Sequence, residues 1–215
     1  MKITVAVLAG LLVSLSTSAQ SIKYLALGDS YTIGESVMKK DRWPEQLVAL
    51  LKKKGKKIRK PTIIGVTGWR TDQLKKAIQE AHLRNEYGMV SLLIGVNNQY
   101  QKKSVESYAP EFEELLQMAI ILAGGKKDNV FVVSIPDYGY TPFGKPNQPG
   151  ITKDIEQYNA TNKSITEKKG VTYINITDLT QLGLDHPDYV AEDGLHPSGK
   201  MYSLWVERII PLLTR

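Results

Sequence analysis

Short apolar runs alternate with longer segments of helical periodicity along this sequence. The apolar runs, each about the length of one β-strand, are residues 22–28, 61–66, 89–94, 130–135 and 172–176. Apolar side chains recur at helical spacing in residues 43–54, 71–86, 104–123, 151–168 and 198–213. Parallel strands need long crossovers, so this alternation is typical of a parallel α/β sheet. We therefore predict a three-layer α/β/α sandwich around a five-stranded parallel sheet, with the common strand order 2-1-3-4-5.

The first residues form a pattern of their own. Residues 1–19 combine a lysine at position 2, an apolar run from Ile3 to Val13, and small polar residues before Ala19. This pattern is typical of a secretory signal peptide that is cleaved after Ala19. A membrane span is the alternative, but the run has about half of the ~20 apolar residues that a spanning helix needs. We expect a secreted or periplasmic protein without a stable membrane anchor, in which residues 20–215 form one domain.

Composition excludes further classes of protein. The chain has no cysteine, so it has neither a disulfide nor a lipid attached to cysteine. Its formal net charge is +6, and many of the cations lie in KKKGKKIRK, residues 52–60. No aromatic residues interleave these lysines, as a nucleic-acid platform would require. We interpret the run as the solvated end of a helix and expect no nucleic-acid partner.

The stretch LALGDSYTIGES, residues 25–36, ends the first apolar run with a candidate nucleophile. In a sheet of order 2-1-3-4-5, ligands bind in the crevice between the carboxyl ends of strands one and three. Ser30 lies just after strand one, and GVNN, residues 95–98, follows strand three. Ser30 is therefore either a nucleophile at that crevice or a polar residue that caps the next element.

A serine hydroxyl needs a neighbouring base to become a nucleophile. Of the three histidines, His82 lies in a helical pattern and His186 in a long loop, whereas His196 follows Asp193 by three residues in EDGLHPS. Residues three apart on a tight turn share a face, so the carboxylate can orient the imidazole and leave one nitrogen free for the serine proton. We predict Ser30 as nucleophile, Asp193 as orienting acid and His196 as general base. Ordinary turn hydrogen bonds are the alternative for His196.

Attack by serine on a carbonyl group also needs donors for the negative charge that develops on oxygen. The backbone N–H of Ser30 is one candidate. Gly68, in GVTGWRT after strand two, is a second, because glycine lets the backbone approach a ligand closely. The side-chain amide of Asn97 is the third. Gly68 can instead serve only a turn, and Asn97 can bond its own backbone, but their positions after strands two and three favour an oxyanion hole.

Four blocks of the sequence resemble, in order and spacing, those of the SGNH (GDSL-type) hydrolases. They are GDS at 28–30, Gly68, GVNN at 95–98 and DGLH at 193–196, and together they extend over most of the chain. The resemblance implies a flavodoxin-like sandwich in which Ser30, Asp193 and His196 are catalytic. By the same resemblance, the Ser30 amide, Gly68 and Asn97 form the oxyanion hole.

Two blocks depart from the pattern of that family. GDSY replaces GDSL, which should leave the turn intact, and GVNN ends in Asn98 where the family usually has aspartate. Asn98 can hydrogen-bond but cannot carry a charge, so a supporting role of the usual aspartate is in question. We do not expect this change to abolish activity.

The resemblance and the positions of nearby residues also predict a substrate pocket, lined by Asp29, Trp69, Arg70, Asn98 and Tyr138. Trp69 and Arg70 directly follow Gly68, although Arg70 can instead bond the end of a helix or strand. Tyr138 belongs, with Tyr140 and Phe143, to a loop rich in proline, glycine and aromatic residues. These rings either stack on a sugar or form a wall for an acyl group, or they pin the loop to the body of the protein.

The sequence therefore predicts a secreted serine esterase that acts through an acyl-enzyme on Ser30. Its expected substrates are short acyl or acetyl esters, including those of carbohydrates and lysophospholipids. No metal is expected, because His186 with Asp185 and Asp188 makes a weak metal site. No cofactor is expected, because no glycine-rich phosphate loop follows strand one. The alternative is a non-catalytic secreted module that binds a glycan or lipid on the same fold.

Overall fold

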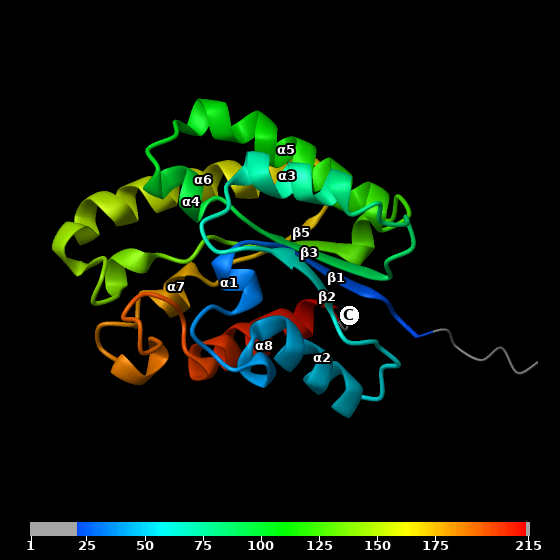
Figure 1. Cartoon of the computed structure of the whole chain (residues 1–215), viewed down its shortest axis with the longest axis horizontal. Helices are drawn as coiled ribbons and strands as arrows, with labels where there is room; N and C mark the ends of the chain where they lie inside the picture. The colour runs from blue at the N-terminus through cyan, green and yellow to red at the C-terminus, as the bar shows by residue number, and fades with distance from the viewer. Residues whose placement is uncertain (1–20, 214–215) are drawn as a thin grey trace, which may run out of the picture.

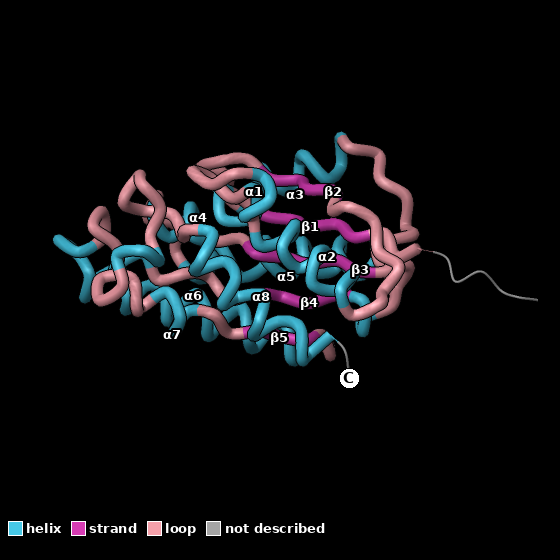
Figure 2. The backbone as a smooth tube through the Cα atoms, turned by 90° about the horizontal axis from the view of Figure 1, so that it is seen from below, coloured by secondary structure: helices cyan, strands magenta, loops and turns pink. Residues whose placement is uncertain are grey.

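A computed structural model describes residues 21–213 of the chain. Its centre is a parallel sheet with the strand order β2-β1-β3-β4-β5 (Figures 1 and 2). The strands are β1 (Tyr24–Gly28), β2 (Thr62–Gly65), β3 (Met89–Leu93), β4 (Val130–Val133) and β5 (Thr172–Ile174). The predicted fold class and strand order are confirmed. The predicted signal peptide, residues 1–19, lies outside the described residues.

Helices cover both faces of the sheet, with α3, α5 and α6 on one side and α2 and α8 on the other (Figure 1). The helices are α1 (Ser30–Ile33), α2 (Trp43–Lys53), α3 (Thr71–Glu80), α4 (Val96–Tyr100), α5 (Val105–Leu122), α6 (Gln148–Lys168), α7 (Thr177–Thr180) and α8 (Gly199–Leu213). Short 3₁₀ turns lie at η1 (Lys39–Asp41), η2 (Lys127–Asn129), η3 (Tyr138–Tyr140), η4 (Lys145–Asn147) and η5 (Pro187–Tyr189). Within residues 21–213, none of the helices has the length and apolar character to cross a bilayer.

The core explains why the strands read as continuous apolar runs. β1, β3 and β4 are buried along their whole length, because helices cover both of their faces. On the α2 and α8 side, the indole rings of Trp43 and Trp205 are completely buried. Trp43 contacts Phe131 of β4 edge-on, with ring centroids 6.4 Å apart. The amphipathic helices thus bury their apolar faces against the sheet, as their spacing predicts.

The register of the central strands places three loops at one edge. Gly28 at the end of β1 pairs with Gly65 of β2 and with Leu93 of β3, so the three strands end at the same level. After β3, Gly95 has φ +131°, and a Cβ there would lie 2.6 Å from the hydroxyl of Tyr108. Any side chain at this position would displace Tyr108 or Ile135 and strain the backbone, so glycine is favoured here, and the turn leads directly into α4.

The elements differ from the prediction most in three places. Helix α3 ends at Glu80 rather than at residue 86, and His82 lies in the turn beyond it with φ +45°. This turn lets Leu83 pack against the core. Helix α6 begins at Gln148, three residues earlier than predicted. Helix α4 was not predicted, because four of the five residues in VNNQY have weak helix propensity and tertiary contacts decide their conformation.

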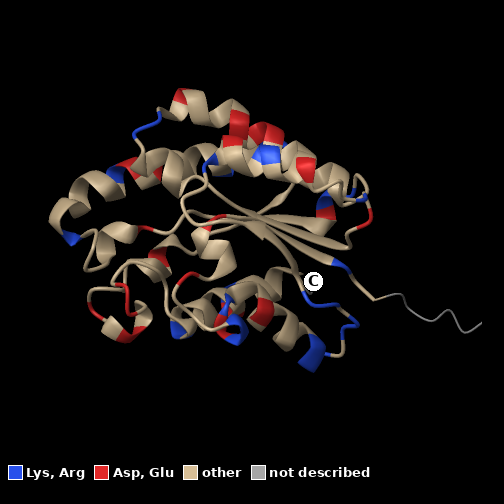
Figure 3. Ribbon diagram, in the orientation of Figure 1, with Lys and Arg blue, Asp and Glu red and all other residues tan. Residues whose placement is uncertain are grey.

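The lysine-rich run at residues 52–60 covers the last turn of α2 and the loop that leads to β2 (Figure 3). All of its cationic side chains are exposed, and only Ile58 within it is buried. The run precedes β2, so it lies at the amino-terminal edge of the sheet. That edge is opposite the one from which the loops after β1 and β3 depart.

Candidate active site

Ser30 begins helix α1 directly after β1. Asp29 caps this short helix, because its Oδ1 accepts a hydrogen bond from the backbone N–H of Tyr31 at 3.1 Å. The backbone carbonyl of Asp29 accepts the N–H groups of Thr32 and Ile33, each at 3.0 Å. The chain therefore turns sharply at Ser30, which is 4% exposed. The capping role considered for Ser30 belongs to Asp29.

His196 lies just before α8, and Asp193 holds its ring. The distance from His196 Nδ1 to Asp193 Oδ2 is 2.6 Å. The other carboxylate oxygen accepts the backbone N–H groups of Leu195 and His196, both at 2.9 Å. An anionic acceptor favours the proton on Nδ1, which leaves Nε2 free to accept a proton. The Asp–His pair expected from the sequence is thus in direct contact.

Asp193 remains ionised because of its hydrogen bonds. Burial raises the pKa of Asp193, but donors from Ser36, His196 and two backbone N–H groups outweigh burial and lower the pKa to about 2. The carboxylate is therefore negative at neutral pH and can stabilise a protonated imidazole. On its other side, the imidazole lies beside the ring of Tyr31, with centroids 5.5 Å apart.

A cavity of about 180 Å³ brings the predicted residues together. Ser30, Gly68, Asn97 and His196 all line it, although they come from four separate segments of the chain. Asp193 does not line the cavity, but it contacts it through His196. The remaining wall is largely apolar and includes Tyr31, Val96, Tyr100, Tyr138, Phe143 and Leu195. A serine, an imidazole and two candidate oxyanion donors thus surround one space.

The loop after β2 places Gly68 at this cavity, and helix α4, which follows β3, places Asn97 there. Gly68 has φ +84°, and no heavy atom lies within 4 Å of the position that a Cβ would take. Backbone conformation, not lack of space, therefore favours glycine here. The amide of Asn97 donates a hydrogen bond to the carbonyl of Trp69 at 3.0 Å, and it carries a second N–H. Asn97 thus bonds the loop after β2 rather than its own backbone.

Of the five predicted pocket residues, all of which lie in the described part of the chain, only Tyr138 lines the cavity. Its hydroxyl donates a hydrogen bond to Gln99 Oε1 at 2.9 Å. Phe143 from the same loop also lines the cavity and is 50% exposed, whereas Tyr140 does not line it. Two aromatic residues of this loop, Tyr138 and Phe143, therefore form part of the cavity wall, and Tyr140 does not.

The other four residues of the predicted pocket do not line this cavity, and each has structural partners. Asp29 is completely buried beneath Ser30. Trp69 is half-buried and packs against the core. Arg70 donates two hydrogen bonds to the carboxylate of Asp72, at 3.0 and 2.8 Å, and a third to Gln101 at 2.5 Å. Arg70 thus has the alternative role considered from the sequence, in which its side chain bonds at the end of a helix.

Asn98, the fourth of these residues, is buried and holds the first residue of α3. Its Oδ1 accepts the backbone N–H of Thr71 at 3.1 Å, and its Nδ2 donates to the Thr71 hydroxyl at 2.7 Å. The Thr71 hydroxyl in turn donates its proton to the carboxylate of Glu111. The amide at position 98 therefore supplies a donor that an aspartate lacks, and Glu111 is the reason that this donor is needed.

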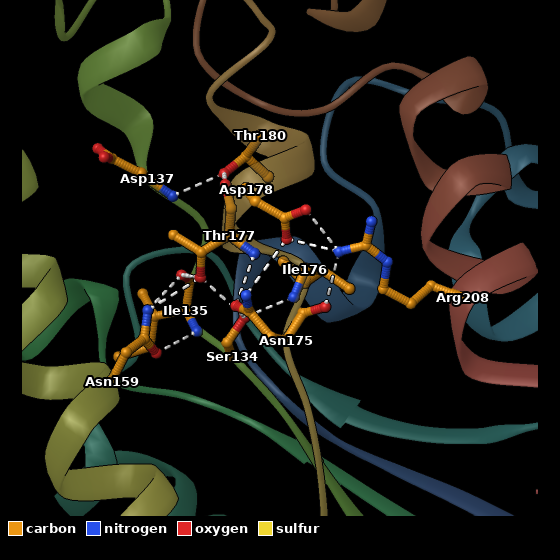
Figure 4. A network of polar contacts seen from close by, with 10 residues as sticks. All are labelled: Ser134, Ile135, Asp137, Asn159, Asn175, Ile176, Thr177, Asp178, Thr180 and Arg208. Carbon is orange, nitrogen blue, oxygen red and sulfur yellow. Dashed lines mark hydrogen bonds and ion pairs between the residues drawn. The ribbon is translucent and has the colours of Figure 1, made fainter. Parts of the chain in front are cut away.

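A polar network fixes the loop that carries Tyr138 (Figure 4). Asn159 of α6 holds both backbone groups of Ile135: it accepts the N–H at 2.8 Å and donates to the carbonyl at 2.9 Å. The backbone N–H of Asp137 donates to the hydroxyl of Thr180 in α7 at 2.9 Å. Tyr138 therefore follows a segment whose backbone is tied to two helices.

The weak metal site considered from the sequence has other contacts. The ring of His186 stacks on Tyr189 with centroids 4.8 Å apart. Asp188 forms an ion pair with Lys200. These side chains contribute to the packing of the loop before α8.

Sequence reasoning missed five residues of the cavity wall: Tyr31, Thr67, Val96, Tyr100 and Leu195. Four of them are chain neighbours of predicted residues, so adjacency to the four sequence blocks was the available signal. Tyr100 comes from α4, a helix that the sequence did not predict, and no signal marked it.

Comparisons with known proteins give further information on this fold and site. A family model described as the GDSL-like lipase/acylhydrolase family matches residues 26–204. No significant match occurs among curated protein sequences. Among solved structures, Axe2, an acetylxylan esterase from Geobacillus stearothermophilus, has a TM-score of 0.71 and 19% identity, covering 90% of this chain and 94% of its own. TesA has a TM-score of 0.71 and 15% identity, with coverage of 89% and 98%. The psychrotrophic esterase EstA from Pseudoalteromonas sp., inhibited by monoethylphosphonate, has a TM-score of 0.64 and 14% identity, with coverage of 89% and 96%.

The contacts of Asn98 predict that Asn98→Asp destabilises the fold by about 1–3 kcal/mol. The single hydroxyl proton of Thr71 is already donated to Glu111, so the new carboxylate oxygen would face an acceptor. Urea unfolding at pH 7 measures the difference. Adding Glu111→Gln to Asn98→Asp should recover most of the loss, because glutamine can donate a hydrogen bond. Equal stability of Asn98→Asp and the wild type would contradict this account.

The buried carboxyl group of Asp29 should make the free energy of unfolding depend on pH. Burial raises the pKa of Asp29 to about 7, although a backbone N–H from Tyr31 acts in the opposite direction. Within residues 21–213, Oδ2 has no hydrogen-bond partner. An unfolded aspartate titrates near 3.9. The folded protein therefore holds this proton to higher pH, and the wild type loses stability as pH rises from about 4 to about 7.

Asp29→Asn keeps the capping oxygen and removes the titration. Its free energy of unfolding, relative to the wild type, should rise over the same pH window by up to about 4 kcal/mol, at 1.4 kcal/mol per pKa unit. Urea unfolding at pH 4.5, 6 and 8 measures this difference. A difference that stays constant with pH would show that Asp29 does not titrate in this range.

Proposed function

The chain belongs to the GDSL-like lipase/acylhydrolase family, and from this premise we propose that it is a serine esterase that acts through an acyl-enzyme on Ser30. One observation carries the proposal. Ser30 and His196 line the same cavity as Gly68 and Asn97, and His196 Nδ1 lies 2.6 Å from Asp193 Oδ2. Nucleophile, base and oxyanion donors are the groups that ester hydrolysis requires.

In the proposed first step, Ser30 Oγ attacks the ester carbonyl while His196 Nε2 accepts the hydroxyl proton. The carboxylate of Asp193 stabilises the imidazolium that forms. The carbonyl oxygen becomes an oxyanion, which accepts hydrogen bonds from the Ser30 and Gly68 backbone N–H groups and from the second N–H of Asn97. The tetrahedral intermediate then expels the alcohol, which takes the proton from His196 and leaves an acyl group on Ser30.

In the second step, water replaces the alcohol. His196 accepts a proton from water as the water oxygen attacks the acyl carbon, and the same oxyanion donors serve again. Collapse of the intermediate returns the proton to Ser30 Oγ and releases the carboxylic acid.

The size of the cavity supports short acyl groups as substrates. The cavity has a volume of about 180 Å³. Its largely apolar wall suits an alkyl group. A second, wider cavity of about 780 Å³ shares Tyr100, Tyr138 and Phe143 with the first, and the proposal assigns the alcohol part of the ester to this wider cavity. Acetylated sugars combine a small acyl group with a large alcohol, and the structural likeness to an acetylxylan esterase supports them over lysophospholipids.

Secretion is part of the same proposal. It rests on residues 1–19, whose single lysine, apolar run and small residues before Ala19 match a signal peptide. An enzyme exported in this way would meet esters of extracellular polymers or lipids, consistent with its proposed substrates.

We predict that Ser30→Ala abolishes both hydrolysis of p-nitrophenyl acetate and labelling by a fluorophosphonate, because the phosphonyl group needs the serine oxygen. Asn97→Ala is the matched control: it keeps the nucleophile and should still be labelled, but its turnover should fall by about 10²–10³. Full activity of Ser30→Ala would exclude the mechanism. A wild-type protein that neither turns over nor is labelled would support the non-catalytic binding module instead.

Chain-length preference tests the proposed acyl site. The ratio kcat/KM should fall at least about tenfold between p-nitrophenyl butyrate and octanoate, since the extra methylenes exceed the cavity. Phe143→Ala removes a half-exposed ring from the cavity wall, so it should reduce the difference in kcat/KM between the two esters. Equal rates for both esters in the wild type would show that the cavity does not limit the acyl group.

A further inference from the structure

The segment after α1 touches both sides of the candidate active site. The hydroxyl of Ser36 donates a hydrogen bond to Asp193 Oδ2 at 2.5 Å, across 157 residues of sequence. The preceding residue, Glu35, accepts a hydrogen bond from the hydroxyl of Thr67, which lies next to Gly68. Residues 35 and 36 thus connect the candidate oxyanion loop with the acid that orients His196.

Ser36 adopts a backbone conformation that serine seldom takes. Its φ is +63°, and Ser36 is one of three residues other than glycine with positive φ among residues 21–213. An L-residue with a Cβ is strained in this left-handed region, where glycine fits without cost. Ser36 lies within the turn that the hydrogen bond from Val37 N–H to the carbonyl of Gly34 closes at 3.4 Å. A strained residue is retained where its side chain is needed, and here the side chain reaches Asp193.

The hydrogen bond from Ser36 completes the set of donors around Asp193. Oδ1 accepts two backbone N–H groups, and Oδ2 accepts His196 Nδ1 and the Ser36 hydroxyl. Four donors use the principal acceptor sites of a carboxylate, so its rotation is blocked. The Ser36 bond also helps to lower the pKa of Asp193, which keeps the proton on His196 rather than on the carboxylate.

We propose that Ser36 is a positioning residue for the reaction, one that holds the Asp193 carboxylate in the orientation in which it fixes the ring of His196. The proposal rests on the function proposed above, since it assigns His196 the role of base. Ser36 touches neither the cavity nor the substrate. Ser36 acts on His196 through Asp193. Glu35 accepts the hydrogen bond from Thr67 and so links the same segment to the loop that carries Gly68.

The substitution Ser36→Gly distinguishes the proposed positioning role from a purely structural role. Glycine relieves the left-handed strain and removes the hydroxyl, so the melting temperature should stay the same or rise. If Ser36 positions Asp193, kcat for p-nitrophenyl acetate should nevertheless fall about tenfold, which is the rate equivalent of one charge-assisted hydrogen bond. Rates are expressed per active site titrated with the fluorophosphonate, so that partly unfolded protein does not imitate the effect.

The low-field proton NMR signal of His196 Nδ1–H gives a second measurement. It should broaden and weaken in Ser36→Gly, because the carboxylate that protects this proton can rotate away. His82→Gly is the matched control: His82 also has positive φ, at +45°, but it is exposed and lies in the turn after α3. This variant should relieve the same kind of strain without changing kcat or the NMR signal.

The outcomes distinguish the two proposals. A wild-type kcat and an unchanged NMR signal in Ser36→Gly would overturn the positioning role, even if Ser30→Ala is inactive. Equal losses of kcat in Ser36→Gly and His82→Gly would also overturn it, since they would reflect a general effect on the fold. Activity that persists in Ser30→Ala would instead refute the esterase mechanism itself.

Discussion

The hydrogen-bond register of β1 with its two neighbours is the constraint on which the rest of the site depends. Gly28 pairs with Gly65 on one side and Leu93 on the other, so three parallel strands end at one level. The loops that follow must leave from the same edge. Ser30 and Asn97 lie within a few residues of their strand ends, as does Gly68. Their meeting in one cavity is therefore a consequence of strand pairing.

Asp193 and Asp29 carry the same chemical group, but their different surroundings give the two carboxyl groups different pKa values and different roles. Asp193 receives four hydrogen bonds, and its pKa falls to about 2. Asp29, directly before Ser30, is completely buried with one oxygen unpartnered, and burial raises its pKa to about 7. The first is suited to stabilise a positive imidazole, whereas the second caps a helix and need not carry a charge. Such divergence of pKa values between neighbouring acids is a common way of assigning roles in a site.

Much of the fold and the centre of the candidate site could be predicted, because both follow local rules. Apolar periodicity indicated each strand, and the D-x-x-H spacing placed Asp193 against His196. The pocket wall followed no such rule. Arg70 and Asn98 are near the site in sequence, yet their side chains turn to Asp72 and Thr71, because buried and half-buried polar groups bond the nearest available partner. Tyr100 reaches the wall on a helix whose residues have weak helical propensity.

The sequence by itself determined the α/β class and the residues that follow each strand, because periodicity and chain connectivity are properties of the local chain. The strand order was expected only as the common one for this class, and the pairing of the strands in the tertiary structure decided it. Only the tertiary structure decided which side chains around that edge face the cavity. It also decided that Ser36 reaches Asp193 across 157 residues. Such contacts depend on the packing of distant segments and on a left-handed backbone at one serine, and neither leaves a periodic signal in the sequence.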